Sequence, residues 1–213
     1  MVKSIHTLLS LSQKPGEKNE DKMKTETPKT YEWLSDFKDQ LLARTLFKKM
    51  FDEAQNPFYS IFDLADWDSK YKIGWNSMGF YPDFLVISTV DDPKLGKKMV
   101  LPEHVIEFIP ASSKKEAHYI CAVLNSSIVK KSLRTLSDGG KSGLSRTILS
   151  RIRLDKFDPK NPLHDALASL SIEAHSIAEK NDLPELKKVE KSINETVEQL
   201  YKTPKKKINN LAT

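Results

Sequence analysis

Positively charged side chains are concentrated in one stretch of the chain, residues 128–153. This stretch holds seven Lys and Arg residues and one Asp, so its formal charge of +6 exceeds the +5 of all 213 residues. A glycine-rich loop, Gly139-Gly140-Lys141-Ser142-Gly143, lies in its middle, and small residues let a backbone come close to a partner. Loop and cations together predict a surface that binds a polyanion. The cations are Lys130, Lys131, Arg134, Lys141, Arg146, Arg151 and Arg153.

Two short fragments contain residues that enzymes use for catalysis, and neither fits its full motif. Gly140-Lys141-Ser142 matches the end of a phosphate-binding P-loop, but that motif needs a glycine where Thr135 stands. Asn56-Pro57-Phe58-Tyr59 resembles the Asn-Pro-Pro-Tyr tetrapeptide of amino-methyltransferases, but Phe58 replaces the second proline. No glycine-rich cofactor loop follows a strand upstream of it. We therefore expect the chain to have no catalytic residues of its own.

A stand-alone Mg²⁺-dependent nuclease is an alternative, with Asp83, Asp92 and Lys94 as its acids and lysine. In such a site the second acid and the lysine stand two apart on one strand, where they share a face and bind the metal and a water. Pro93 between them would interrupt strand hydrogen bonding. A proline turn that joins two strands is the simpler interpretation of these residues.

Other features bound the class of protein. The single cysteine, Cys121, excludes an internal disulfide and a cysteine-based zinc cluster, and its apolar helical neighbours favour a place in the core. The five histidines show no metal-binding spacing. No segment approaches the roughly 20 apolar residues of a membrane span, and the N-terminus lacks a signal-peptide core of ordinary length. We expect a cytoplasmic protein that binds no metal.

Hydrophobic periodicity predicts an α+β fold for the elements that carry these residues. From Tyr31 to about Ala54, apolar residues recur at spacings near three and four, which predicts one amphipathic helix. Short aromatic or β-branched runs between Pro, Gly and Asp clusters then predict a mixed or antiparallel sheet. The expected strands are Phe58–Asp63, Tyr71–Trp75, Phe84–Ser88 and Val105–Ile109.

Helices flank this sheet in the second half of the chain. Ser113 is placed to cap a first helix, and Ile128 to about Leu136 forms the next. Ser145 can cap a short helix after the glycine loop, and a strand-like Arg153–Phe157 follows. Pro162 begins a long helix, and the capping-box spacing of Asp182-Leu183-Pro184-Glu185 begins the last, so a helical hairpin or coiled-coil arm is expected.

Composition divides the chain into four regions. Residues 1–30 read as a flexible N-terminal segment, because Lys14–Lys29 is rich in charge and nearly free of apolar residues. Such a beginning resembles the middle of a longer polypeptide, so we expect a split or truncated protein. Residues 31–160 form the expected sheet-containing domain, residues 161–202 the helical hairpin or arm, and residues 203–213 a basic disordered tail.

Several ordered segments carry a resemblance to a known family. Ala117–Ser127, the glycine loop and Leu149–Leu154 together resemble DNA target-recognition domains. They are similar to the specificity subunits of type I restriction systems, and more so to the C-terminal domains of adenine-N6 DNA methyltransferases and type IIG restriction-modification enzymes. Leu154-Asp155-Lys156 departs from the usual isoleucine-proline ending. Weaker resemblances lie at Tyr71–Trp75, Val90–Pro93, Leu101–His104, Lys156–His164 and Ile193–Tyr201.

This resemblance covers roughly residues 31–201 and implies a module that recognises a specific double-stranded DNA sequence. It implies that a methyltransferase catalytic domain or subunit, elsewhere, binds S-adenosylmethionine, and that this chain binds no cofactor. Phosphate contacts supply most of the affinity of such a module, and side chains in a groove supply specificity. The residues expected to contact phosphates are Lys130, Lys131, Arg134 and Arg151. Those expected to enter a groove are Lys141, Ser142, Ser145 and Arg146. A second, polar and aromatic cluster on the strand side consists of Tyr71, Lys72, Trp75 and Asn76, although Trp75 also reads as a core residue.

A third interpretation requires no DNA. The apolar residues of the last helix alternate at spacings of three and four, as in a coiled coil. A helical-arm interaction protein would self-associate through Leu186 to Leu200 and show no salt-dependent affinity for DNA.

Overall fold

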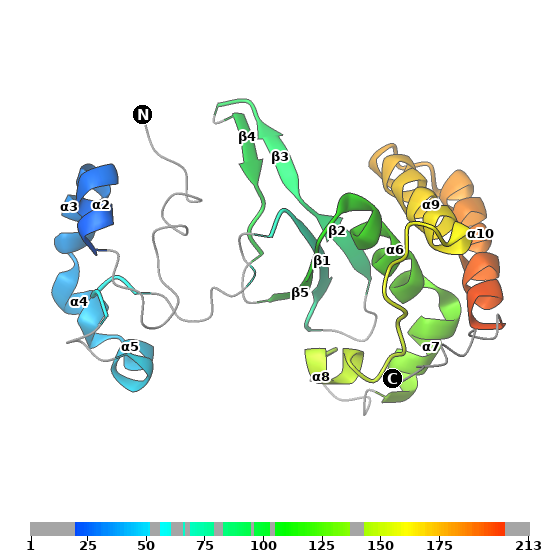
Figure 1. Cartoon of the computed structure of the whole chain (residues 1–213), viewed down its shortest axis with the longest axis horizontal. Helices are drawn as coiled ribbons and strands as arrows, with labels where there is room; N and C mark the ends of the chain where they lie inside the picture. The colour runs from blue at the N-terminus through cyan, green and yellow to red at the C-terminus, as the bar shows by residue number, and fades with distance from the viewer. Residues whose placement is uncertain are drawn as a thin grey trace, which may run out of the picture. The chain divides into compact units, whose positions relative to one another are not determined.

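The chain divides into two units, Met1–Ser69 with Val90–Met99 and Lys70–Thr89 with Val100–Thr213. The fold is α+β, as the sequence predicts, with an antiparallel sheet and helices packed against it (Figure 1). This computed structural model describes residues 20–51, 56–60, 66, 69–78, 83–94, 96–102, 105–136 and 143–202.

The first unit contains short helices between residues 20 and 50, and the second unit contains a sheet and further helices. Two other strands, β3 (Thr89–Asp92) and β4 (Gly96–Met99), pair with each other as a hairpin. The first unit contains α2 (Glu20–Glu26), α3 (Pro28–Ser35), α4 (Lys38–Ala43) and α5 (Thr45–Met50). The second contains β1 (Tyr71–Asn76), β2 (Phe84–Ile87), β5 (Ile106–Ala111), α6 (Lys114–Asn125), α7 (Ser127–Leu136), α8 (Arg146–Leu149), α9 (Pro162–Glu179) and α10 (Leu183–Lys202).

The sheet of the second unit has the order β2-β1-β5, with both neighbours antiparallel to β1. Its central strand is buried from Lys72 to Trp75. A Cβ atom at Gly74 of this strand would lie 2.4 Å from the Cδ1 of Ile87, so a larger residue there would require the Ile87 side chain to shift. Three of the expected strands are thus confirmed as β1, β2 and β5.

Helix α6 is the centre of the second unit. Ser113 caps it by accepting a hydrogen bond from the Glu116 N–H, as the sequence predicts. Every residue from Ala117 to Leu124 is buried, because the helix lies between the sheet and the pair α9–α10 (Figure 1). Helices that are apolar around their whole circumference occur in such positions. The expected core position of Cys121 is confirmed.

Side chains from two helices cover the outer edge of β2. The side chain of Asn125 donates to the carbonyl of Phe84 at 2.7 Å and accepts from its N–H at 3.1 Å. The Nε2 of His175 accepts from the N–H of Val86 at 3.2 Å. An edge strand with unpaired backbone groups attracts other chains, so these contacts protect β2 while they attach α6 and α9 to it.

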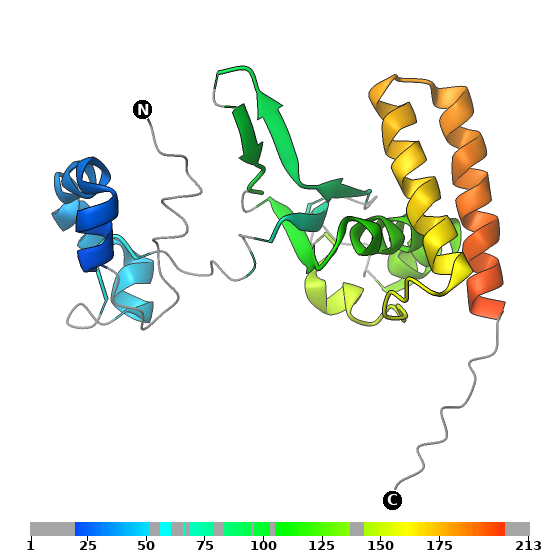
Figure 2. The ribbon, with the colours of Figure 1, turned by 45° about the horizontal axis from the view of Figure 1, so that its top comes forward.

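Helices α9 and α10 form the expected hairpin (Figure 2). Asn161 caps α9 through the Leu163 N–H, and Asp182 accepts a hydrogen bond from the Glu185 N–H at the start of α10. The buried residues of α10 belong to the same core as α6, so the hairpin is packed against the unit and is not a separate arm. These residues are Val189, Ile193, Val197 and Leu200.

The expected single helix from Tyr31 to about Ala54 is instead three helices, α3 to α5. The chain leaves the helical conformation at Arg44, whose φ and ψ are −56° and 132°. There the guanidinium of Arg44 donates to the carbonyl of Leu41 at 2.7 Å and to those of Phe58 and Ser60 at 3.0 Å and 2.8 Å. These contacts to a distant segment outweigh the local preference for a continuous helix. The expected end near Ala54 lies outside the described residues.

Part of the expected N-terminal linker is also helical. Residues 20–26 form α2, and Pro28 takes the first position of α3, where its missing N–H costs nothing. Met23 is 1% exposed and packs with Phe58 and Tyr59 in a small core of the first unit. Composition missed this helix because one apolar residue suffices to anchor it.

Two expected strands differ from the structure. Residues 58–60 of the expected strand Phe58–Asp63 belong to a turn and not to a strand, and residues 61–63 lie outside the described part. Arg153–Phe157 belongs to no helix or strand and pairs with none of the described strands. Three hydrogen bonds hold the chain there instead: from the Tyr119 hydroxyl to the Asp155 carbonyl, from the Tyr201 hydroxyl to the Arg153 carbonyl, and from the Asp158 N–H to the His164 Nδ1. The expected tail after residue 202 lies outside the described residues.

Among the described helices, none combines the length and the apolar character needed to cross a membrane.

A buried histidine makes the stability of the second unit depend on pH. His118, on α6, lies 3.0 Å (Nδ1) from the Ser171 hydroxyl of α9, and its ring meets that of His175 edge-on. Burial, with smaller contributions from His175 and Lys114, lowers the pKa of His118 to about 4. The folded protein therefore keeps this ring neutral at a pH where the unfolded chain protonates it.

We expect the free energy of unfolding to fall by about 2 kcal/mol between pH 7 and pH 4.5 through His118 alone. The unfolded chain takes up a proton below its pKa near 6.5, whereas the folded protein does so only near 4, so acid favours unfolding. Urea titrations over this range measure the effect. His118→Gln, which can still hydrogen-bond to Ser171, should have a flatter profile; identical profiles for both proteins would contradict this account.

Candidate nucleic-acid interface

Residues 128–153, called the basic stretch below, contact one end of the sheet of the second unit. Trp75, near the end of β1, lies opposite Phe84 of β2 and Glu107 of β5. Asp83, which precedes Phe84, and Glu107 therefore lie at the same end, together with the exposed Asn76. Sequence distance gives no sign of this, because these residues come from three separate segments.

Three contacts attach the basic stretch to that end. The Nζ of Lys130, on α7, lies 2.6 Å from the Oδ1 of Asp83. The indole Nε1 of Trp75 donates to the carbonyl of Leu144 at 2.8 Å. The Nε of Arg146, on α8, lies 2.8 Å from the Oε2 of Glu107. Both helices that flank the glycine loop are thus positioned by the sheet.

Gly143 allows the chain after the loop to approach β1. A Cβ atom on this residue would lie 1.7 Å from the carbonyl oxygen of Ser77 and 3.0 Å from the Cα of Met78. Both neighbours are backbone atoms, which cannot move aside as a flexible side chain can. A close approach of the glycine loop thus occurs at Gly143, against the chain's own backbone at Ser77 and Met78, just after β1.

Helix α7 exposes cations on the side away from the core. Val129 and Leu133, four residues apart, are buried and fix the orientation of the helix. Lys131 and Arg134 are consequently exposed, and Lys130 lies between the two sides. The predicted exposure of this part of the stretch is confirmed for Lys131 and Arg134.

Helix α8 is short and depends on its cap and on Arg146. The Ser145 hydroxyl accepts from the Ile148 N–H at 3.4 Å, which confirms the predicted cap, and Leu149 is buried. The guanidinium carbon of Arg146 lies 5.6 Å from the ring centroid of Phe108, a cation–π arrangement. Arg151, just beyond the helix, is exposed and makes no ion pair with any residue that the structure describes.

Two predicted contact residues are in the core. Lys72 and Trp75 are both 0% exposed, so neither side chain reaches the surface of the folded chain, and the core position that the sequence also indicated for Trp75 is confirmed. The Nζ of Lys72 lies 5.9 Å from the ring centroid of Phe108, and Trp75 holds Leu144. Asn76 remains exposed and accepts the Met78 N–H at 2.9 Å. Lys141 and Ser142 lie outside the described residues.

The sequence did not point to Glu107, and it pointed to Asp83 as a metal ligand only. Both carboxylates contact cations of the basic stretch, 39 and 47 residues away along the chain. Residues separated this widely along the sequence share no helical or strand repeat, so no local sequence pattern could have revealed these contacts. Only the register of the sheet brings the pairs together.

The residues of the nuclease alternative have other roles. Asp92 ends β3, its Oδ1 accepts the Lys94 N–H at 2.8 Å, and Pro93 lies in the turn before β4. The predicted proline turn is therefore confirmed, and Asp92 and Lys94 do not share a strand. Asp83 is paired with Lys130. Across the described residues, no cluster of three His, Cys, Asp or Glu side chains is arranged to hold a metal ion.

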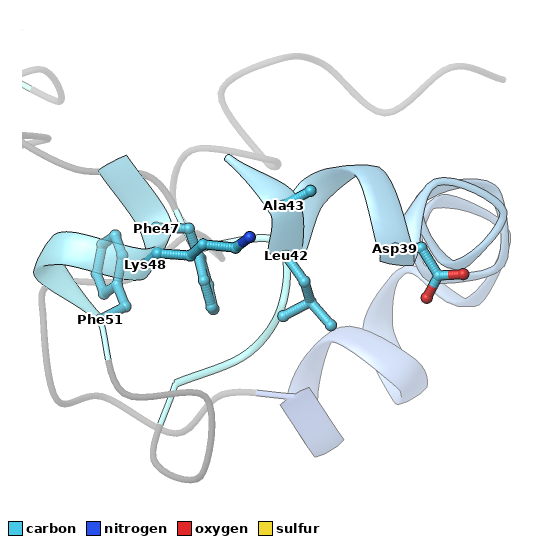
Figure 3. A pocket seen from close by; sticks show the side chains of 6 residues that line it. All are labelled: Asp39, Leu42, Ala43, Phe47, Lys48 and Phe51. Atoms are coloured by element: carbon cyan, nitrogen blue, oxygen red, sulfur yellow. The ribbon is translucent and has the colours of Figure 1, made fainter. Parts of the chain in front are cut away.

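A hollow of about 430 Å³ lies in the first unit, and all of its lining residues fall between Asp39 and Phe51 (Figure 3). Helices α4 and α5 line it with a mixture of apolar and charged side chains. No histidine or cysteine lines it, and its two charged residues are of opposite sign. The lining residues are Asp39, Leu42, Ala43, Phe47, Lys48 and Phe51.

The cysteine is chemically inert in this environment. Burial raises the pKa of the Cys121 thiol to about 12, and its Sγ donates to the carbonyl of Phe84 at 3.3 Å. A thiol must be deprotonated to act as a nucleophile. Cys121 therefore stays protonated at neutral pH.

No model of a known protein family matches this chain, and no curated protein matches it. The resemblance to target-recognition domains thus stays a prediction.

We expect Gly143→Ala to lower the free energy of unfolding by about 1–3 kcal/mol, because the added methyl group overlaps the Ser77 carbonyl and forces the loop exit away from β1. Urea denaturation followed by circular dichroism measures this. Thr147→Ala, at an exposed position of α8 four residues later, serves as the control and should change stability by less than about 0.5 kcal/mol. Equal stability of the two variants would show that the loop exit is not held as described.

Proposed function

We propose that this chain is a sequence-specific recognition module for double-stranded DNA, belonging to an adenine-N6 DNA methyltransferase or a restriction-modification enzyme. Its own residues recognise the duplex and break no bond. The catalytic domain or subunit that binds S-adenosylmethionine is the partner that this module positions on its target.

The observation that carries the proposal is the convergence of the basic stretch on one end of the sheet. Lys130 and Arg146 are attached there through Asp83 and Glu107, and Gly143 packs against β1. A surface whose cations are fixed by a folded core suits a duplex, because regularly spaced phosphates reward charges held at fixed positions. A solvated charged surface alone would need no such contacts with the sheet.

The exposed residues divide into the two roles that duplex recognition needs. Lys131, Arg134 and Arg151 are placed for phosphate contacts, which orient a protein on DNA without reading its sequence. Ser145 and Asn76 offer hydrogen-bonding groups at the sheet end, and Arg146 has the planar donor group that binds guanine in the major groove. Phosphate contacts from α7 and groove contacts from α8 and the sheet end would together select a sequence.

The burial of α10 counts against the helical-arm alternative. Self-association was expected through Leu186 to Leu200, and Val189, Ile193, Val197 and Leu200 of this range are already covered by the rest of the second unit. Dimerisation through that face would require the hairpin to leave α6, with the loss of a large buried apolar area. We therefore favour recognition of DNA over association through the last helix.

The proposal is tested by DNA affinity as a function of salt, measured by fluorescence anisotropy with a randomised 30-base-pair duplex. We expect Lys131→Ala, Arg134→Ala and Arg151→Ala, combined, to weaken binding and to reduce the slope of log K against log salt by about 2–3, since each phosphate contact contributes roughly 0.9. Selection from the randomised pool should also enrich one sequence.

The matched control removes three exposed cations of α10, namely Lys187→Ala, Lys188→Ala and Lys191→Ala. It changes the net charge by the same amount on a different element. If both triple variants lose affinity equally, the binding is a general effect of charge. If the wild-type protein shows no salt-dependent affinity for duplex DNA, the proposal is wrong.

A further inference from the structure

Two cations of the proposed interface are occupied by carboxylates of the same chain. Lys130 lies 2.6 Å from Asp83, and Arg146 lies 2.8 Å from Glu107. Asp83 directly precedes β2 and Glu107 lies in β5, and the sheet register puts both acids at the same end of the sheet. The Lys130 and Asp83 side chains are 26% and 82% exposed and those of Arg146 and Glu107 are 57% and 33% exposed, so each pair is partly accessible to an arriving ligand.

A carboxylate and a DNA phosphate bind the same donors. Each presents anionic oxygens to the ammonium of a lysine or the guanidinium of an arginine. An exposed ion pair is worth only about 0.2–1 kcal/mol, so a phosphate can displace the carboxylate, although the displacement reduces the affinity. The displaced acid also remains close to the phosphates and repels them.

We propose that Asp83 and Glu107 are built-in competitors of DNA phosphate. In the free protein they hold Lys130 and Arg146 in the folded arrangement, and they lower the affinity for any duplex by occupying these cations. The inference rests on the proposed function, because the competing ligand is the duplex that this function requires.

Weakened phosphate binding is useful to a protein that must find one sequence. Non-specific affinity comes almost entirely from phosphate contacts, and a genome offers a very large number of non-specific sites. Partial neutralisation of the basic stretch therefore keeps the protein from being held at the wrong sites. Asp83 and Glu107 would set this level without touching a base.

A third ion pair of the same unit provides a control. Lys115 on α6 lies 2.6 Å from Asp165 on α9, with both side chains about half exposed. Asp165→Asn removes one negative charge and releases one lysine, as Asp83→Asn does, but neither Lys115 nor Asp165 belongs to the basic stretch or to the sheet end. The net charges of the two variants are identical.

The experiment compares the full chain with Asp83→Asn, Glu107→Gln and Asp165→Asn by fluorescence anisotropy on a randomised 30-base-pair duplex, from 50 to 300 mM salt. We expect Asp83→Asn and Glu107→Gln each to raise the affinity about two- to fivefold at the lowest salt and to steepen the salt slope by up to roughly 0.9. Asp165→Asn should change the affinity less than about twofold.

Two further variants guard against changes in folding. Asp83→Glu keeps the carboxylate and should bind duplex within about twofold of the wild-type protein. The double variant Asp83→Asn with Glu107→Gln should gain roughly the product of the two single effects, because the two pairs share no residue. Unchanged thermal unfolding of each variant shows that the interface is intact.

The outcomes separate this inference from the proposed function. If the wild-type protein binds duplex with a salt slope that the combined Lys131→Ala, Arg134→Ala and Arg151→Ala variant reduces, and the Asp83 and Glu107 variants match Asp165→Asn, the inference is overturned and the proposed function stands. If Asp83→Asn or Glu107→Gln binds more weakly, the carboxylates position the cations and do not compete with DNA, so the inference is again wrong. If no protein binds duplex, both are wrong.

Discussion

The complete burial of α6 is the constraint on which the second unit depends. From Ala117 to Leu124 no residue of this helix faces solvent, so the helix must be covered by the sheet on one side and by α9–α10 on the other. Its end also supplies Asn125, which pairs with both backbone groups of Phe84 and closes the edge of β2. A polar residue at the end of an apolar helix thus joins the helix to the sheet. Its hydrogen bonds are directional and fix the position of the helix along the strand, which hydrophobic contacts alone would not do.

The position of the basic stretch follows from this arrangement. Helix α7 continues directly from α6, and its buried Val129 and Leu133 fix which side faces outward. Trp75 is held in the core by the sheet, and its indole N–H fixes Leu144 beyond the loop. Cations on both sides of the glycine loop therefore have defined positions, and the acids that pair with them were placed by the same sheet register. The positions of these cations and of the acids that pair with them thus have one structural origin.

The first unit shows how a few tertiary contacts overrule local patterns. Helical periodicity continues across Arg44, but this residue adopts an extended conformation and its guanidinium binds three carbonyls, two of them in residues 58–60. Met23, the isolated apolar residue of a charged segment, is buried against Phe58 and Tyr59. In both cases one side chain meets a partner far away in sequence, and the favourable contact exceeds the weak intrinsic preference of the segment.

The sequence by itself determined the α+β class, the strands β1, β2 and β5, the caps at Ser113 and Ser145 and the helices from α6 to α10, because periodicity and capping are local properties. It also located the charge between residues 128 and 153. Only the tertiary structure decided that Lys72 is a core residue, that Gly143 serves the contact with Ser77, and that Asp83 and Glu107 meet Lys130 and Arg146. These outcomes depend on strand register and helix packing, which join residues tens of positions apart and leave no period in the sequence.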